Sequence, residues 1–221
     1  MSKELIICLG DEYTNHLCNV DSELCKLIEV IGNYKLSLQE NYYDALVKRI
    51  IGQQLSLKAA NTIISRVVNN SLLLTPQIIN EKSDIELRQC GLSYQKIAYI
   101  RELTNSVLSG NIDLEKLSLE NDSKVIESLI QIKGIGIWTA EMFLIFSLGR
   151  ENILSNSDVS IRNAILWLYN IEGKDIDWEH YWKTWSPYNT IVSLYLWEIV
   201  NRNYIKNFKD INELYKSTKA K

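Results

Sequence analysis

Turn-forming residues are scarce in this chain, since only 2 of its 221 residues are proline and 9 are glycine. A β-sandwich needs such residues between nearly every pair of strands. Hydrophobic residues make up 46% of the sequence and charged residues 23%, which excludes a disordered or low-complexity chain. The sequence therefore predicts an all-α protein that is long enough to bury a core.

Apolar residues recur at intervals of three and four along much of the chain, as they do on the buried face of a helix. The clearest case covers residues 42–51, and after Gly52-Gln53-Gln54 a second helix is expected over about 56–68. The same pattern predicts helices near 77–89, 94–109 and 122–131, one ending at Leu148, one starting near Asp158, and one running through Tyr195 and Trp197.

The cysteine and histidine content excludes several kinds of catalytic centre. The four cysteines form no C-x-x-C pair, so neither a zinc ribbon nor an iron–sulfur loop fits their spacing. The only histidines are His16 and His180, which disfavours a histidine metal centre or a Ser-His-Asp triad. No window approaches the roughly 20 apolar residues of a membrane span. We therefore expect a soluble, intracellular (cytoplasmic) protein with reduced thiols and no membrane partner.

The most specific stretch runs from 129 to 148 and is typical of a helix, a tight hairpin and a second helix. In the hairpin Lys133-Gly134-Ile135-Gly136, the glycines allow positive φ or close approach, while Ile135 anchors the turn. Backbone N–H groups and the start of the second helix would then point at one external spot, which suits a phosphate. A plain turn with glycine caps explains the same letters, so the surrounding sequence must decide between the two.

Five stretches follow one another over about residues 16–200: Ala45–Ser56, Gly91–Ile97, Lys133–Met142, Ser157–Arg162, and Trp185–Tyr188 with Leu194–Trp197. In this order they resemble the helix-hairpin-helix (HhH-GPD) DNA glycosylase superfamily. Within it, the closest match is the 3-methyladenine DNA glycosylase II branch, in a short form without the extra N-terminal domain.

The resemblance implies two helical lobes with a DNA-binding cleft between them, forming a single catalytic unit over residues 1–221. One lobe would cover 41–150 and include the helix-hairpin-helix motif at 129–148. The other would combine 1–40 with 151–221, and thus both ends of the chain.

The function implied by the resemblance is that of a monofunctional DNA glycosylase in base excision repair. Such an enzyme flips an alkylated purine, above all 3-methyladenine, out of the duplex and hydrolyses its N-glycosidic bond, leaving an abasic site. Relatives that also cut the strand carry a lysine nucleophile at the position of Trp138, so no lyase activity is implied. The expected partner is damaged double-stranded DNA, the expected state is a monomer, and no cofactor is implied.

The resemblance also assigns roles to individual residues. Asp158 would be catalytic, with its carboxylate stabilising positive charge on the sugar and orienting water, although an Asp at this place in a helix is more commonly an N-cap. The remaining assignments are Gln54 and then Gln53 as the DNA wedge; Trp138, Trp197 and Met142 as the base pocket; and Lys133, Gly134, Ile135, Gly136 and Thr139 as contacts to the DNA backbone, where the hairpin carbonyls could also hold a monovalent cation.

Two other functions stay open. A glycosylase for oxidised or mismatched bases would share most of these motifs, although Trp138 and the absence of an iron–sulfur loop disfavour it. A non-catalytic helix-hairpin-helix module that only binds DNA would explain the two glycines, but it would not explain Asp158, Trp197 and the glutamine pair together.

The formal net charge of -3 disfavours a nucleic-acid protein at first sight, because phosphate binding relies on Lys and Arg. The charge is unevenly distributed, however, and the segment 199–221 is basic. We expect the positive surface that contacts DNA to lie within 41–80. This segment has a single acidic residue, Asp44, and four basic residues: Lys48, Arg49, Lys58 and Arg66.

Overall fold

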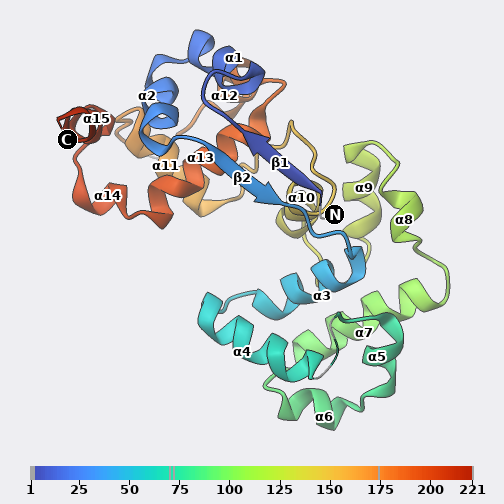
Figure 1. The fold of residues 1–221 in the computed structure, drawn as a ribbon. Helices are drawn as coiled ribbons and strands as arrows, with labels where there is room; N and C mark the ends of the chain where they lie inside the picture. Colours follow the sequence, from blue (N-terminus) through green and yellow to red (C-terminus); the bar gives the residue numbers. More distant parts are fainter. Residues whose placement is uncertain (1–2, 70, 72, 174, 221) are drawn as a thin grey trace. The chain divides into compact units, whose positions relative to one another are not determined.

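The computed structural model describes residues 3–69, 71, 73–173 and 175–220. Over these residues the chain forms fifteen helices and one two-stranded sheet (Figure 1). The helical fold class predicted from the sequence is confirmed. The sheet, which was not predicted, pairs β1 (Glu4–Ile7) with β2 (Tyr34–Ser37) in antiparallel register.

Contacts divide the chain into two compact units. The hairpin unit contains Leu38–Leu148 together with Lys3, and the terminal unit contains Glu4–Ser37 with Gly149–Lys221. Each unit has a hydrophobic core of its own, so each is described by itself.

The hairpin unit is built around α3 (Tyr42–Gly52), which packs against α4, α7 and α10. Its apolar stripe is fully buried, with Val47, Ile50 and Ile51 each 0% exposed. Several helices begin after a polar residue whose side chain accepts a hydrogen bond from the first turn, as N-caps do. The other helices of the unit are α4 (Leu57–Val68), α5 (Pro76–Glu81), α6 (Asp84–Gln89), α7 (Tyr94–Leu108), α8 (Leu114–Leu117), α9 (Asp122–Leu129) and α10 (Ile137–Phe146).

The single helix predicted near 77–89 is wrong, because this segment forms α5 and α6 with a break at Lys82. Ser83 is the N-cap of α6, and α5 ends just before it. Its hydroxyl accepts from the Glu86 backbone N–H at 3.2 Å, and the Glu86 carboxylate accepts from the Ser83 N–H at 2.7 Å. This reciprocal capping box outweighs the continuous apolar periodicity.

The terminal unit is centred on α13 (Asn189–Asn201), which packs against α2, α11, α12 and α14. α13 is apolar nearly all round, but it has only 13 residues, and no helix in the described part of the chain is long and apolar enough to cross a membrane. The other helices of the unit are α1 (Glu12–Val20), α2 (Ser22–Ile31), α11 (Val159–Leu168), α12 (Trp178–Trp185), α14 (Tyr204–Asn207) and α15 (Ile211–Lys219).

A disulfide joins Cys18 in α1 to Cys25 in α2, so the expectation of reduced thiols is wrong for this pair. The short turn between the two helices brings the Cα atoms to 4.4 Å, which the sequence separation of seven did not reveal. At the same turn the Asp21 carboxylate accepts hydrogen bonds from the Tyr169 hydroxyl at 2.5 Å and the Trp185 indole N–H at 2.8 Å. Burial, followed by the charge of Asp21, raises the pKa of Tyr169 far above its usual range. The start of α2 is thereby fastened to α11 and α12.

Candidate functional site

In the hairpin between α9 and α10, the backbone of Gly134 packs closely against the ring of Tyr99. Gly134 has φ +97°, and a Cβ added there would lie 2.1 Å from Cγ of the Tyr99 ring. The Ile135 N–H donates to the Ile132 carbonyl at 3.0 Å, and Ile135 is 4% exposed. Glycine is therefore required at position 134, and Ile135 anchors the turn in the core.

Gly136 has a different role from Gly134. Its φ of -94° suits any residue, but a Cβ added there would meet nothing within 4 Å. Gly136 is the N-cap of α10, and no side-chain hydrogen bond caps this helix, so the cap position is available to an outside acceptor. Lys133 is exposed beside this position, whereas Thr139 is 3% exposed and can offer a phosphate only its backbone N–H. This helix start has the features of an anion site.

The two glutamines after α3 differ in structure. Gln53 donates from its side-chain amide to the Gly134 carbonyl at 2.9 Å and thereby joins the end of α3 to the hairpin. Lys96 joins the same end of α3 to α7 by donating to the Ile51 and Gln53 carbonyls, each at 2.6 Å. Gln54 is exposed and has φ +58°, a conformation that is uncommon for residues other than glycine. Gln53 thus acts as a tether, while the side chain of Gln54 stands at the surface.

A groove of about 400 Å³ runs between this turn and the hairpin. Two hairpin carbonyls, those of Ile132 and Gly134, already accept hydrogen bonds and are less suited to a cation. A monovalent cation on the remaining hairpin carbonyls stays a prediction. The groove is lined by Gln53, Gln54, Ser93, Gln95, Lys96, Tyr99, Gly134, Ile135 and Gly136.

Trp138 lines a second pocket of about 520 Å³, which we call the Trp138 pocket. Arg49 lies over the indole, with its Cζ 5.8 Å from the ring centroid of Trp138 and 5.2 Å from that of Phe146. Burial lowers the pKa of the Arg49 guanidinium. The pocket is lined by Gln39, Ala45, Lys48, Arg49, Gly52, Gln53, Gln54, Leu55, Leu57, Ala60, Asn61, Ile64 and Trp138.

Sequence reasoning placed Arg49 on a positive surface, but it is half-buried on aromatic rings. The signal that could have shown this is its spacing of three and four residues from Leu46 and Ala45, which are both buried. Lys48 is tied down as well, because its ammonium pairs with the Asp44 carboxylate at 2.6 Å.

The other two base-pocket candidates lie elsewhere. Met142 is 2% exposed and lines a cavity of about 10 Å³, which is far too small for a base. Trp197 belongs to the terminal unit, where it is half-buried on α13 although Leu196 and Ile199 beside it are fully buried. Of the three residues, only Trp138 lines a pocket of the hairpin unit that is large enough for a base.

Asp158 is the N-cap of α11 in the terminal unit and is 8% exposed. Its Oδ1 accepts from the backbone N–H groups of Ser160 at 2.8 Å and Ile161 at 3.0 Å. The capping role weighed from the sequence is therefore real. Because two donors fix one carboxylate oxygen, the orientation of the whole group is set before any ligand binds.

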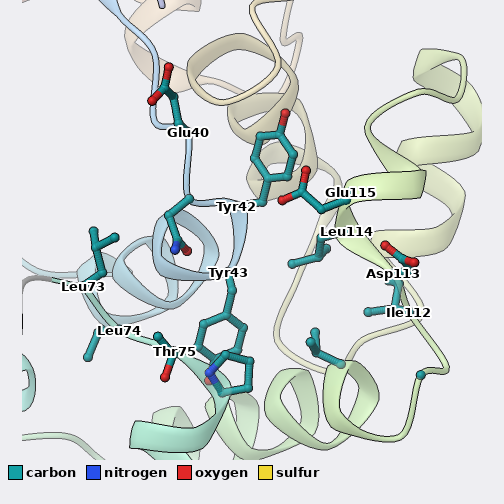
Figure 2. A pocket seen from close by; sticks show the side chains of 14 residues that line it. Glu40, Tyr42, Tyr43, Leu73, Leu74, Thr75, Ile112, Asp113, Leu114 and Glu115 are labelled. Carbon is teal, nitrogen blue, oxygen red and sulfur yellow. The ribbon is translucent and has the colours of Figure 1, made fainter. Parts of the chain in front are cut away.

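A further pocket of the hairpin unit contains none of the predicted site residues (Figure 2). It has a volume of about 560 Å³ and is lined by carboxylates from two places in the chain, Glu40 before α3 and Asp113 and Glu115 around α8. None of the described residues that line it is a Lys or Arg. We call it the acidic pocket.

Comparison with known proteins places this geometry in a family. Residues 47–187 match the HhH-GPD superfamily of base excision DNA repair proteins. The DNA-3-methyladenine glycosylase 1 of Schizosaccharomyces pombe is 34% identical over 209 residues, covering 89% of this chain and 90% of its own.

Two solved structures are similar along most of their length. DNA-3-methyladenine glycosidase from Bacillus halodurans has a TM-score of 0.85 and 38% identity, covering 95% of this chain and 98% of its own. The 3-methyladenine DNA glycosylase of Schizosaccharomyces pombe in complex with abasic DNA has a TM-score of 0.78 and 31% identity, covering 86% and 97%. Because the family match spans more than half of the sequence, this chain belongs to the HhH-GPD superfamily of base excision DNA repair proteins.

Proposed function

We propose that this protein is a monofunctional 3-methyladenine DNA glycosylase that acts as a monomer on damaged double-stranded DNA. It extrudes an alkylated purine and hydrolyses its N-glycosidic bond, leaving an abasic site. The observation that carries the proposal is the similarity, with a TM-score of 0.78, to a 3-methyladenine DNA glycosylase bound to abasic DNA. Abasic DNA is the product of this reaction.

The hairpin holds the DNA backbone in this proposal. A phosphate oxygen accepts from backbone N–H groups at the start of α10, and the missing side chain of Gly136 lets the DNA backbone come close. Lys133 adds a positive charge at the surface. Most of the holding is done by backbone dipoles, so a protein with a net charge of -3 can still bind DNA.

Asp158 carries out the chemical step. Breaking the glycosidic bond leaves positive charge on the sugar, and a carboxylate about 4 Å away at an effective dielectric near 20 could stabilise it by at most about 4 kcal/mol. That corresponds to a rate factor on the order of a thousand. The hydrogen bonds from Ser160 and Ile161 hold the carboxylate in place, and the same group orients the attacking water. An alkylated purine is already cationic and leaves without a strong general acid.

Gln54 and the tryptophans handle the extruded nucleotide. The exposed side chain of Gln54 fills the gap in the base stack, and its left-handed backbone conformation is the kind of strain that collects at functional positions. Trp138 stacks on the base, where a cationic purine gains from the ring face, and Trp197 stays a predicted base-pocket residue. Gln53 and Met142 support the base pocket without contacting the base. Gln53 does so through its hydrogen bond to the Gly134 carbonyl, and Met142 is buried.

The substrate is tested by incubating the protein with duplexes that carry 3-methyladenine, 7-methylguanine, ethenoadenine, hypoxanthine or 8-oxoguanine. We expect release of 3-methyladenine, and the strand should stay intact until alkali is added, because Trp138 cannot form a Schiff base. Release of 8-oxoguanine alone would instead support a glycosylase for oxidised bases. Binding without release of any base would support the non-catalytic module.

A further inference from the structure

Arg49 is a half-buried cation without a counter-charge in the Trp138 pocket. Among the residues that the structure describes, none forms an ion pair with its guanidinium and none accepts a hydrogen bond from it. Other basic residues of the same unit are paired, such as Lys48 with Asp44 and Arg101 with Asp84. Partial burial of a charge without a protein acceptor still has a cost, which hydrogen bonds to a ligand in the pocket would offset.

The surroundings of Arg49 narrow down what it could bind. Its contacts to the rings of Trp138 and Phe146 engage the faces of the guanidinium and leave its five N–H donors unused. The pocket contains a second cation, Lys48, and no acidic residue. A ligand here should therefore be planar, so that it can lie against Trp138, and should present hydrogen-bond acceptors to the guanidinium.

A purine with a carbonyl at C6 meets both conditions. It presents O6 and N7 together, the acceptor pair that arginine binds with two hydrogen bonds in guanine. 3-Methyladenine has an amino group at C6, which would point its N–H donors at the N–H donors of Arg49. The positive charge of this base is also repelled by the guanidinium. The pocket thus distinguishes two classes of extruded base.

Resting on the proposed glycosylase function, we infer that Arg49 is a specificity-determining residue that favours a neutral 6-oxopurine, of which hypoxanthine is the simplest, over cationic 3-methyladenine. When the C1′–N9 bond of a neutral purine breaks, its electron pair stays on N9 and spreads onto O6. Arg49 donates hydrogen bonds to that developing oxyanion. Water supplies the hydroxyl that bonds to C1′, and the proton it loses neutralises the departing base.

The two substrates respond to Arg49 in different ways. 3-Methyladenine leaves as a neutral base, so no negative charge develops and the guanidinium gives no help. Hypoxanthine leaves as an anion, so loss of the guanidinium slows its release. Removing Arg49 should therefore change the ratio of the two rates, which a general DNA-binding arginine would not do.

The test is single-turnover release of hypoxanthine and of 3-methyladenine from duplexes of matched sequence by the wild-type protein, Arg49→Gln and Lys58→Gln. Lys58 is the control, because it is an exposed cation on α4 outside the Trp138 pocket, and the substitution makes the same charge change. We expect Arg49→Gln to slow hypoxanthine release by roughly tenfold while 3-methyladenine release holds or rises. Lys58→Gln should affect both substrates by a common factor.

Arg49→Lys guards against a loss of folding in the glutamine variant. It keeps the charge and loses the two-pronged donor, so hypoxanthine release should still fall relative to 3-methyladenine release. The inference is overturned if the wild-type protein does not release hypoxanthine, or if both rates fall together in the Arg49 variants. Failure of the wild-type protein to release any base would instead reject the glycosylase function on which the inference rests.

Discussion

The acidic pocket and the Trp138 pocket have nearly the same volume, about 560 Å³ and 520 Å³, and both belong to the hairpin unit. They differ in charge, since three carboxylates and no base line the first, while two bases and no acid line the second. DNA is a polyanion, so only the second suits it. Pocket size alone does not distinguish the two pockets, whereas the sign of the lining charge favours the Trp138 pocket as the proposed site.

The charged groups in the two pockets are also used differently by the fold. Asp113 caps α8 by accepting from the Lys116 N–H at 3.1 Å, and Glu40 accepts from the Lys3 N–H at 2.9 Å. Arg49 contacts the rings of Trp138 and Phe146, but among the described residues none accepts a hydrogen bond from its guanidinium. Two of the carboxylates thus have hydrogen-bonding roles in the local structure, whereas the hydrogen-bond donors of Arg49 have none, as the proposed ligand contact requires.

Charge reversal in each pocket tests this contrast and should give the largest effect. Arg49→Glu puts a carboxylate in the Trp138 pocket, where its repulsion of the anion that forms as hypoxanthine leaves, about 3 kcal/mol at 6 Å and an effective dielectric of 20, would lower hypoxanthine release on the order of a hundredfold. Glu115→Lys, on the exposed face of α8 in the acidic pocket, should leave base release within about twofold. Single-turnover release measures both, and thermal unfolding checks the fold. Equal losses in the two variants would remove the distinction between the pockets.

Substituting each hairpin glycine should give effects of intermediate size, one on the stability of the fold and the other on DNA binding. Gly134→Ala forces a methyl group into the Tyr99 ring at a positive φ, so the free energy of unfolding should fall by about 2–3 kcal/mol. Gly136→Ala fits its backbone and open surroundings, so stability should hold while DNA affinity falls about tenfold. Urea unfolding and fluorescence anisotropy measure the two quantities. Unchanged affinity in Gly136→Ala would mean that DNA does not approach the start of α10.

Substituting the two glutamines should give the smallest effects. One substitution should lower stability, and the other should slow base release. Gln53→Ala removes the bond to the Gly134 carbonyl and should cost about 1 kcal/mol of stability. Gln54→Ala removes an exposed side chain, so stability should be unchanged while base release slows severalfold, by about 1 kcal/mol of activation free energy. A stability loss in Gln54→Ala with normal release would reverse the roles given to the pair.

The sequence predicted features that depend on neighbours along the chain. The helix at 42–51 followed from its apolar spacing, and the hairpin followed from the two glycines around Ile135. β1 and β2 were not predicted because each strand has only four residues, of which one is buried. Such a run is too short to show the alternation of apolar and polar residues that is typical of a strand. Capping by Ser83 likewise overrode a continuous apolar pattern.

Features that depend on how the fold places side chains in three dimensions could not be predicted. Arg49 looked like a surface cation because the rings that cover it, Trp138 and Phe146, come about ninety residues later in the chain. The Cys18–Cys25 disulfide depends on the angle of a turn between two helices, whereas the thiol prediction rested on compartment alone. In each case, a residue's chemistry is decided by what the fold places beside it.

Asp158 is the residue that we propose drives hydrolysis of the glycosidic bond. Asp158→Asn is the sharpest variant, because asparagine keeps the size and can still cap α11 through its amide oxygen, so only the charge is lost. Single-turnover release of 3-methyladenine should fall on the order of a thousandfold, with DNA affinity and unfolding temperature unchanged. Release at the wild-type rate by a folded, DNA-binding Asp158→Asn protein would contradict the account.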